Sequence, residues 1–341
     1  MNKATTLLGA FFVAALGVAV HMPMAQGQNA PNISQQPPLR LVKTIPLPNV
    51  AGRIDHLNFD LENQRLFVAA LGNNTVEVVD VNSGKVVQTI KGLARPQGVL
   101  YLPAKKRLFV ANAADGKVRI FDDISFHSPR SVELGDDADN IRLDAATQQI
   151  YIGYGSGAIA VLNSEGIRVG EIKLDAHPES FQLEKNGSRI FVNLPDSHKV
   201  AVIDRNKSSI LASWTTGDAA SNFPMALDEA NGRLFIVCRR PAVLLVLDTQ
   251  SGAIVTKLPA AGDCDDLFYD PMRRRLYASG GGGTISVYQQ RDRDHYTELG
   301  AIDTVSGART SFFVPELSRL FLASRREGQR DASIMVYEAL P

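Results

Sequence analysis

Short runs in which apolar and polar residues alternate follow one another along most of the chain. Val76 to Asp80 (VEVVD), Val118 to Asp122 (VRIFD) and Val200 to Asp204 (VAVID) show this pattern. A period of two with many β-branched residues is typical of strands that bury one face. Because no stretch after residue 30 keeps a helical period, the sequence predicts an all-β protein.

A three-residue motif recurs along the chain: a basic or polar residue, then Leu or Ile, then an aromatic residue. The aromatic residues of its seven copies are Phe67, Phe109, Tyr151, Phe191, Phe235, Tyr277 and Phe321. Successive copies are 40 to 44 residues apart, which leaves room for four short strands in each. Four antiparallel strands repeated at this period indicate a β-propeller with one sheet per blade. We therefore expect seven four-stranded blades.

The last copy of the repeat lacks a fourth strand. The strands expected in it are Thr310 to Val314, Leu320 to Ser324 and Ser333 to Glu338. An unassigned strand, Leu41 to Leu47, precedes the first copy and resembles the fourth strands elsewhere. We predict that it completes the last blade, which closes the ring without a covalent link and hides the sheet edges. Residues 39–341 then form a single propeller domain.

The first residues have the features of a signal peptide. Lys3 is followed by the 14-residue apolar run Leu7 to Val20, and small and polar residues come next. The run is short for a membrane-spanning helix, although an uncleaved anchor remains an alternative. We predict a signal peptide over 1–25, with cleavage between residues 25 and 30, and a flexible leader over 26–38. The protein is then periplasmic or secreted.

The charge balance and the cysteine content limit the kinds of function that the sequence allows. The chain has 36 basic and 36 acidic residues, and a net charge of zero argues against nucleic-acid binding. Cys238 and Cys264 are the only cysteines, and in an oxidising compartment they could form a disulfide or remain two buried thiols. No haem-attachment motif is present, and we expect a monomer without a cofactor.

One repeat carries a recognisable family pattern. Phe109 to Asn112 (FVAN), followed by Gly116-Lys117-Val118 and ending in Asp122, resembles the YVTN-type, or YncE-like, propeller repeat. The resemblance runs from about Leu41 to Glu338 and implies an exported seven-bladed propeller. It implies no particular activity, so the site has to be argued from the residues.

Positions that differ between copies are candidates for function, because positions alike in every copy serve the blade. In a propeller the loop leading into each first strand opens on the ligand-binding face. The candidate ligand-binding residues in those loops are His56, Gln97, Asn140, His177, Glu179, Asn222, Asp266 and Arg309. The loops between second and third strands should reach the same face and add Arg239, Arg240, Arg325 and Arg326.

These residues leave several functions open. An arginine-rich half beside an acidic half suits a partner protein or a small anionic ligand, and this non-catalytic reading is our main expectation. The alternative is a lactonase-like hydrolase or lyase that holds a divalent cation, such as Ca²⁺, on the axis through Glu179, Asn140 and Asp266. A redox docking subunit and a merely water-filled funnel also remain.

Overall fold

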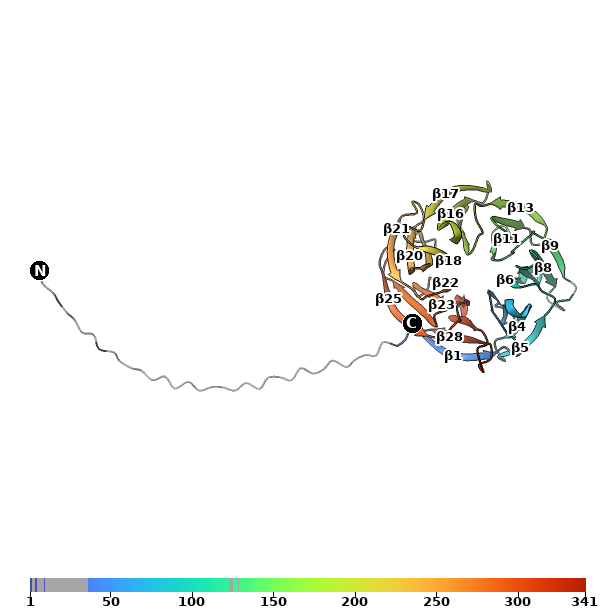
Figure 1. Ribbon diagram of the computed structural model, residues 1–341, viewed down its shortest axis with the longest axis horizontal. Coiled ribbons are helices and arrows are strands. Elements are labelled where there is room, and N and C mark those ends of the chain that lie inside the picture. Colours follow the sequence, from blue (N-terminus) through green and yellow to red (C-terminus); the bar gives the residue numbers. More distant parts are fainter. Residues whose placement is uncertain (2–3, 5–8, 10–35, 123–124, 128) are drawn as a thin grey trace. The chain divides into compact units, whose positions relative to one another are not determined.

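The computed structural model describes residues 36–122, 125–127 and 129–341, together with Met1, Ala4 and Gly9. Residues Pro37–Pro341 form one compact unit of seven four-stranded antiparallel sheets set around a ring (Figure 1). The seven-bladed β-propeller predicted from the repeat is therefore confirmed. The predicted signal peptide and almost all of the leader lie outside the described residues. In the described part of the chain, no helix is long and apolar enough to cross a membrane.

Each blade runs from an inner strand beside the channel to an outer strand at the rim. The inner strands of blades 1 to 7 are β2 (Leu57–Asp60), β6 (Pro96–Leu102), β10 (Ile141–Asp144), β14 (Phe181–Leu183), β18 (Ala220–Asp228), β22 (Cys264–Asp270) and β26 (Ser311–Val314). The second strands are β3 (Arg65–Ala70), β7 (Arg107–Asn112), β11 (Gln149–Tyr154), β15 (Arg189–Leu194), β19 (Arg233–Arg240), β23 (Arg275–Gly280) and β27 (Arg319–Ser324). The third strands are β4 (Thr75–Asp80), β8 (Lys117–Asp122), β12 (Ala158–Leu162), β16 (Lys199–Asp204), β20 (Ala242–Asp248), β24 (Thr284–Gln290) and β28 (Ser333–Ala339). The outer strands are β5 (Lys85–Ile90), β9 (Arg130–Glu133), β13 (Arg168–Lys173), β17 (Ser209–Thr215), β21 (Ile254–Pro259), β25 (Tyr296–Asp303) and β1 (Leu39–Pro46). Short 3₁₀ turns occupy η1 (Leu71–Asn73), η2 (Pro103–Lys105), η3 (Pro195–Ser197) and η4 (Pro315–Leu317).

Blade 7 is closed by the N-terminal strand, as predicted. The outer strand β1 pairs antiparallel with β28, so that Ile45 lies opposite Ile334 and Arg40 lies opposite Glu338, with which it forms an ion pair. Ile45 has no exposed surface and packs into the cluster that joins blade 7 to blade 1. The first and last parts of the propeller are thus held together by backbone hydrogen bonds and buried apolar surface.

The repeated aromatic residues form the interior between blades. All seven are at most 2% exposed, and the described residues contain one hydrophobic cluster at each of the seven junctions between neighbouring blades. Ring pairs cross several of these junctions; for example, Phe67 stacks on Tyr101 at 5.1 Å between centroids, and Phe321 stacks on Phe59 at 5.4 Å. These contacts hold the blades rigidly around the channel, and the site depends on that rigidity.

The arginine that precedes most of these aromatic residues is structural. Arg189 donates to Glu184 of its own blade and lies over the Phe191 ring, with its guanidinium carbon 5.1 Å from the centroid. Arg319 pairs with Glu338 at 3.1 Å across the closed blade. The repeated positions therefore serve the architecture, which leaves the non-repeating polar residues for the channel mouth.

Candidate functional site

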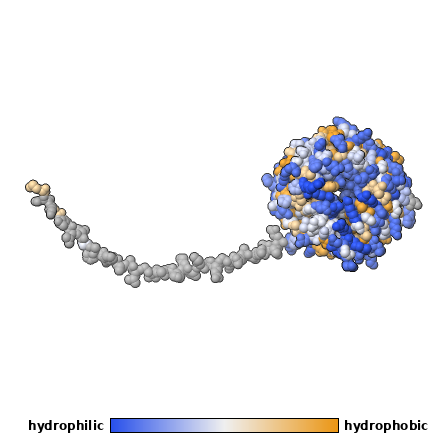
Figure 2. Space-filling model, in the orientation of Figure 1, coloured by the Kyte–Doolittle hydropathy of each residue, from blue (hydrophilic) through white to orange (hydrophobic). Residues whose placement is uncertain are grey.

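The central channel encloses a cavity of about 470 Å³, lined by residues from six of the seven blades. Hydrophilic residues gather around the hollow at the centre of the ring in Figure 2. His56 and Asp266, at the start of the inner strands of blades 1 and 6, line this cavity together with Arg142 of β10. We use "channel mouth" for His56, Asp266 and Arg142 together with the other residues that lead into the seven inner strands.

His56 lies among three carboxyl groups at the channel mouth. Its Nε2 atom is 3.8 Å from Asp55 Oδ1 and 3.7 Å from Asp139 Oδ1, and its Nδ1 atom is 3.8 Å from Asp266 Oδ1. Burial, followed by the positive charge of Arg142, lowers the pKa of His56 to about 4. The imidazole is therefore neutral at physiological pH, and none of these distances is short enough for a hydrogen bond.

Asp266 makes a structural hydrogen bond, and the pKa of its carboxyl group is raised. Its Oδ2 atom accepts a 2.7 Å hydrogen bond from the backbone N–H of Ser311 and so ties blade 6 to blade 7. Burial raises the pKa of this carboxyl group to about 8 in spite of that hydrogen bond, and the neighbouring Asp265 adds to the rise. Asp266 is thus mostly protonated at neutral pH.

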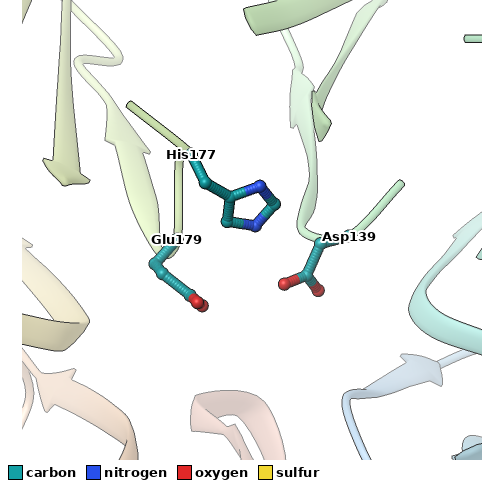
Figure 3. Close-up of side chains that lie close together, drawn as sticks. All are labelled: Asp139, His177 and Glu179. Atoms are coloured by element: carbon teal, nitrogen blue, oxygen red, sulfur yellow. The ribbon is translucent and has the colours of Figure 1, made fainter. Parts of the chain in front are cut away.

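A second group joins the starts of the inner strands of blades 3 and 4. One oxygen of Asp139, one ring nitrogen of His177 and one oxygen of Glu179 all lie within 4.8 Å of one another. Figure 3 shows the three side chains directed into a shared space. Burial, then Asp265 and Asp55, raise the pKa of Glu179 to about 8. Burial, then Glu179, raise the pKa of Asp139 well above its ordinary value.

The arginines of blades 5, 7 and 1 meet two aspartates of blade 6. Arg309 contacts Asp263 at 2.8 Å and Asp265 at 2.6 Å. Arg239 contacts Asp263 at 3.3 Å and forms a shorter ion pair with Asp265, while Arg53 lies 3.9 Å from Asp265. The arginine-rich and acidic halves expected from the sequence are therefore interleaved, and much of their charge is compensated within the protein.

Beside this network lies an arginine-lined pocket of about 300 Å³ between blades 6, 7 and 1. Three arginines line it, Arg53, Arg309 and Arg325, against a single aspartate, Asp263. Arg325 forms no ion pair with any residue that the structure describes. The pocket thus has excess positive charge and one guanidinium group without an acidic partner.

Three residues predicted to bind ligand are engaged elsewhere. Asn222 is fully buried and donates two 2.9 Å hydrogen bonds to oxygens of blade 4, so it braces neighbouring blades. Arg240 donates to the hydroxyl of Ser221, and Arg326 pairs with Asp331 on the exposed loop of blade 7. The structure does not bring these three side chains together with the others.

The three predicted metal ligands have different neighbours in the structure. Glu179 lies beside Asp139 and His177. Asp266 instead lies near His56 and accepts a hydrogen bond from the backbone N–H of Ser311. Asn140 is 1% exposed, and its side-chain oxygen accepts no hydrogen bond from the described residues. Gln97 is likewise buried, at 7% exposed.

Sequence reasoning missed Arg53, Asp263 and Arg142. The first two occupy the same offset, two residues before Asp55 and Asp265, which precede His56 and Asp266 at the starts of the inner strands of blades 1 and 6. Asp137 has this offset in blade 3. A comparison of the repeats one step further upstream would have found them. Arg142 lies inside β10, and its place in the channel follows only from the blade geometry.

Both cysteines are free buried thiols in the structure. Cys238 belongs to the apolar cluster between blades 4 and 5, and Cys264 belongs to the cluster between blades 5 and 6. Burial raises the pKa of Cys238 to about 12 and raises that of Cys264 well above its ordinary value. Of the two alternatives left by the sequence, the disulfide is not formed here, and burial keeps both thiols protonated at neutral pH.

The chain is similar in sequence to a small group of known proteins over part of its length. No protein-family model matches it. The proteins named YncE from Salmonella typhi and Salmonella typhimurium (strain LT2) are each 25% identical to it over 195 residues, 55% of this chain and 54% of theirs. The matching part thus spans about half the length of these relatives, whose description as uncharacterised assigns them no activity.

Two solved structures share the fold. A chain in a crystal structure of the mitotic checkpoint complex superposes with a TM-score of 0.75 at 15% identity, covering 96% of this chain and all of that one. Hydrazine synthase of Kuenenia stuttgartiensis superposes with a TM-score of 0.71 at 16% identity, covering 81% of this chain and 93% of that one. At such identities the similarity concerns the propeller alone.

Proposed function

We propose that this β-propeller, which is related to the YncE-like proteins, binds a small carboxylate- or phosphate-bearing molecule at its channel mouth. The observation that carries the proposal is the arginine-lined pocket, in which Arg325 has no acidic partner among the described residues. A guanidinium group offers a planar fork of donors that matches carboxylate and phosphate oxygens. Arg53 and Arg309 extend the same wall of the pocket.

The size of the pocket favours a small molecule. At about 300 Å³ it lies at the lower end of the range usual for ligand pockets, which is roughly 300–1,000 Å³. Arg309 is held by Asp263 at 2.8 Å through Nη1 and by Asp265 at 2.6 Å through Nε, so the two aspartates fix its guanidinium beside Arg325. A rigid, preformed wall of this kind lowers the entropy lost on binding.

We further propose that binding takes place outside the cytoplasm and that the protein works as a monomer. The support for export is the apolar run Leu7 to Val20 and its flanking residues. A pocket built from one chain needs no second copy to complete it.

Calorimetric titration with inorganic phosphate and with succinate tests the proposal. We expect one saturable site for at least one of these anions, with affinity at least tenfold lower in Arg325→Gln, because a charge-assisted hydrogen bond contributes roughly 1.5–3 kcal/mol. The matched control is Arg326→Gln, which removes the same charge from the neighbouring position but from a side chain that pairs with Asp331. Equal weakening by both substitutions, or no saturable binding of either anion, would refute the pocket.

A metal-dependent hydrolase or lyase remains the second candidate. Such an enzyme would need a divalent ion within reach of the bound molecule. The grouping of Glu179 with Asp139 and His177 is the observation that favours this function. Turnover of ester or lactone substrates that requires Glu179 would favour this candidate over simple binding.

A further inference from the structure

We propose that Asp139, His177 and Glu179 form a binding site for one divalent first-row transition-metal ion. This inference goes beyond anion binding, and it holds or fails independently of the arginine-lined pocket. The site joins the starts of the inner strands of blades 3 and 4, where the chain brings two carboxylates and one imidazole within 4.8 Å of one another.

The orientation of His177 is that of a metal ligand. Its Nδ1 atom lies 2.5 Å from the carbonyl oxygen of Gly155, so Nδ1 carries the proton and donates it to this acceptor. The lone pair then resides on Nε2, which is free to bind a cation. Metal-bound histidines commonly have this arrangement, because the second hydrogen bond fixes the tautomer and the ring orientation.

Asp139 is buried and lacks a hydrogen-bond donor. Its side chain is 9% exposed, and its Oδ1 atom accepts no hydrogen bond from the described residues; Nε2 of His56 lies 3.7 Å away. Glu179 likewise accepts no side-chain hydrogen bond from the residues that the structure describes. Figure 3 shows both carboxylates directed toward the space that His177 also faces.

This situation differs from that of the other acids at the channel mouth. Asp263 and Asp265 are each held by arginines at hydrogen-bonding distance. Two adjacent carboxylates without such partners repel each other strongly in a partly buried site, and a divalent cation between them removes that repulsion. Asp139 and Glu179 thus form a pair of carboxyl groups that has no ion pair with an arginine among the described residues and that His177 adjoins.

The ligand set indicates the class of ion. Imidazole nitrogen suits Zn²⁺, Fe²⁺ and similar ions, whereas Ca²⁺ prefers six to eight oxygen ligands. One nitrogen and two carboxylates thus favour a first-row transition ion such as Zn²⁺ or Mn²⁺ over the Ca²⁺ named as an example under the hydrolase alternative. Three protein ligands also leave at least one coordination position for water or for a bound molecule, as in catalytic zinc sites.

The test is calorimetric titration of the untagged, chelator-treated protein with Zn²⁺ and with Mn²⁺, in a buffer that does not bind metal. We expect one ion per chain, with affinity at least tenfold lower in His177→Ala and in Glu179→Gln, since even outer-shell substitutions cost 10–100-fold. The matched control is His295→Gln. It removes a histidine that contacts a carboxylate, Asp292, at 2.8 Å, but on an exposed turn between β24 and β25.

A second measurement does not depend on the variants folding. Anomalous diffraction at the zinc edge, from crystals of the wild-type protein grown with Zn²⁺, should show a peak between the three side chains. Titrations that show no binding to the wild type, unchanged affinity in the folded Glu179→Gln variant, or a peak confined to other residues would each overturn the proposal.

Discussion

Replacing Asp266 by Asn removes a buried carboxyl group from the channel while preserving its shape. The Asn oxygen can still accept the N–H of Ser311, which is donated to Asp266 at 2.7 Å. In the wild type, burial raises the pKa of this group from 3.8 to about 8. The folded protein therefore keeps the proton up to about pH 8, whereas the unfolded chain releases it near pH 4.

The magnitude follows from this difference in pKa. Between these two values the folded state binds one proton more than the unfolded state, so wild-type stability falls as pH rises. The fall is about 1.4 kcal/mol per pH unit, or roughly 3 kcal/mol between pH 5 and pH 7. The variant lacks this dependence, so its stability relative to the wild type should rise by that amount.

Urea unfolding of both proteins at pH 4, 5, 6, 7 and 8, with a chelator present throughout, measures the effect. The other acids at the channel mouth titrate in both proteins, so the difference between the two curves isolates position 266. We expect similar stabilities at pH 4 and a growing advantage of Asp266→Asn up to about pH 8. A difference that does not change with pH, or a wild type that becomes relatively more stable as pH rises, would show that Asp266 is not protonated in the folded protein at neutral pH.

The other predictions concern ring closure and the thiols. Ile45→Ala in β1 should lower the free energy of unfolding by about 2–5 kcal/mol in urea, because Ile45 is fully buried, whereas Val42→Ala in the same strand, at 43% exposed, should change it little; equal effects would contradict the closure described here. Ellman's reagent should detect neither Cys238 nor Cys264 in the native protein and two thiols per chain after unfolding; no thiols after unfolding under non-reducing conditions would demonstrate a disulfide.

The architecture could be predicted from the sequence because it is repeated. Each copy of the aromatic motif buries its ring against a neighbouring blade, so the same sequence pattern occurs seven times along the chain. The closing strand was predictable for the same reason: counting strands left one blade short of a strand and one strand, near Leu41 to Leu47, without a blade.

The site could be predicted only in part. Its location followed from where the inner strands begin, and His177 and Glu179 were identified in this way. Which side chains face one another was not predictable, because the inner strands begin irregularly; the pairing of β18 with β19, for example, shifts register just after Asn222. At such a shift the alternation of side chains between faces is lost, and Asn222 turns into the blade interface instead of the channel.

We propose that this propeller binds small anions at the channel mouth and on no other surface. The most direct test is a crystal structure of the protein grown with saturating phosphate or succinate. The anion should lie in the pocket between blades 6, 7 and 1, within hydrogen-bonding distance of Arg325 and Arg309. An empty pocket in crystals whose protein binds the same anion in solution, or an anion bound on another face, would show that this pocket is not the binding site.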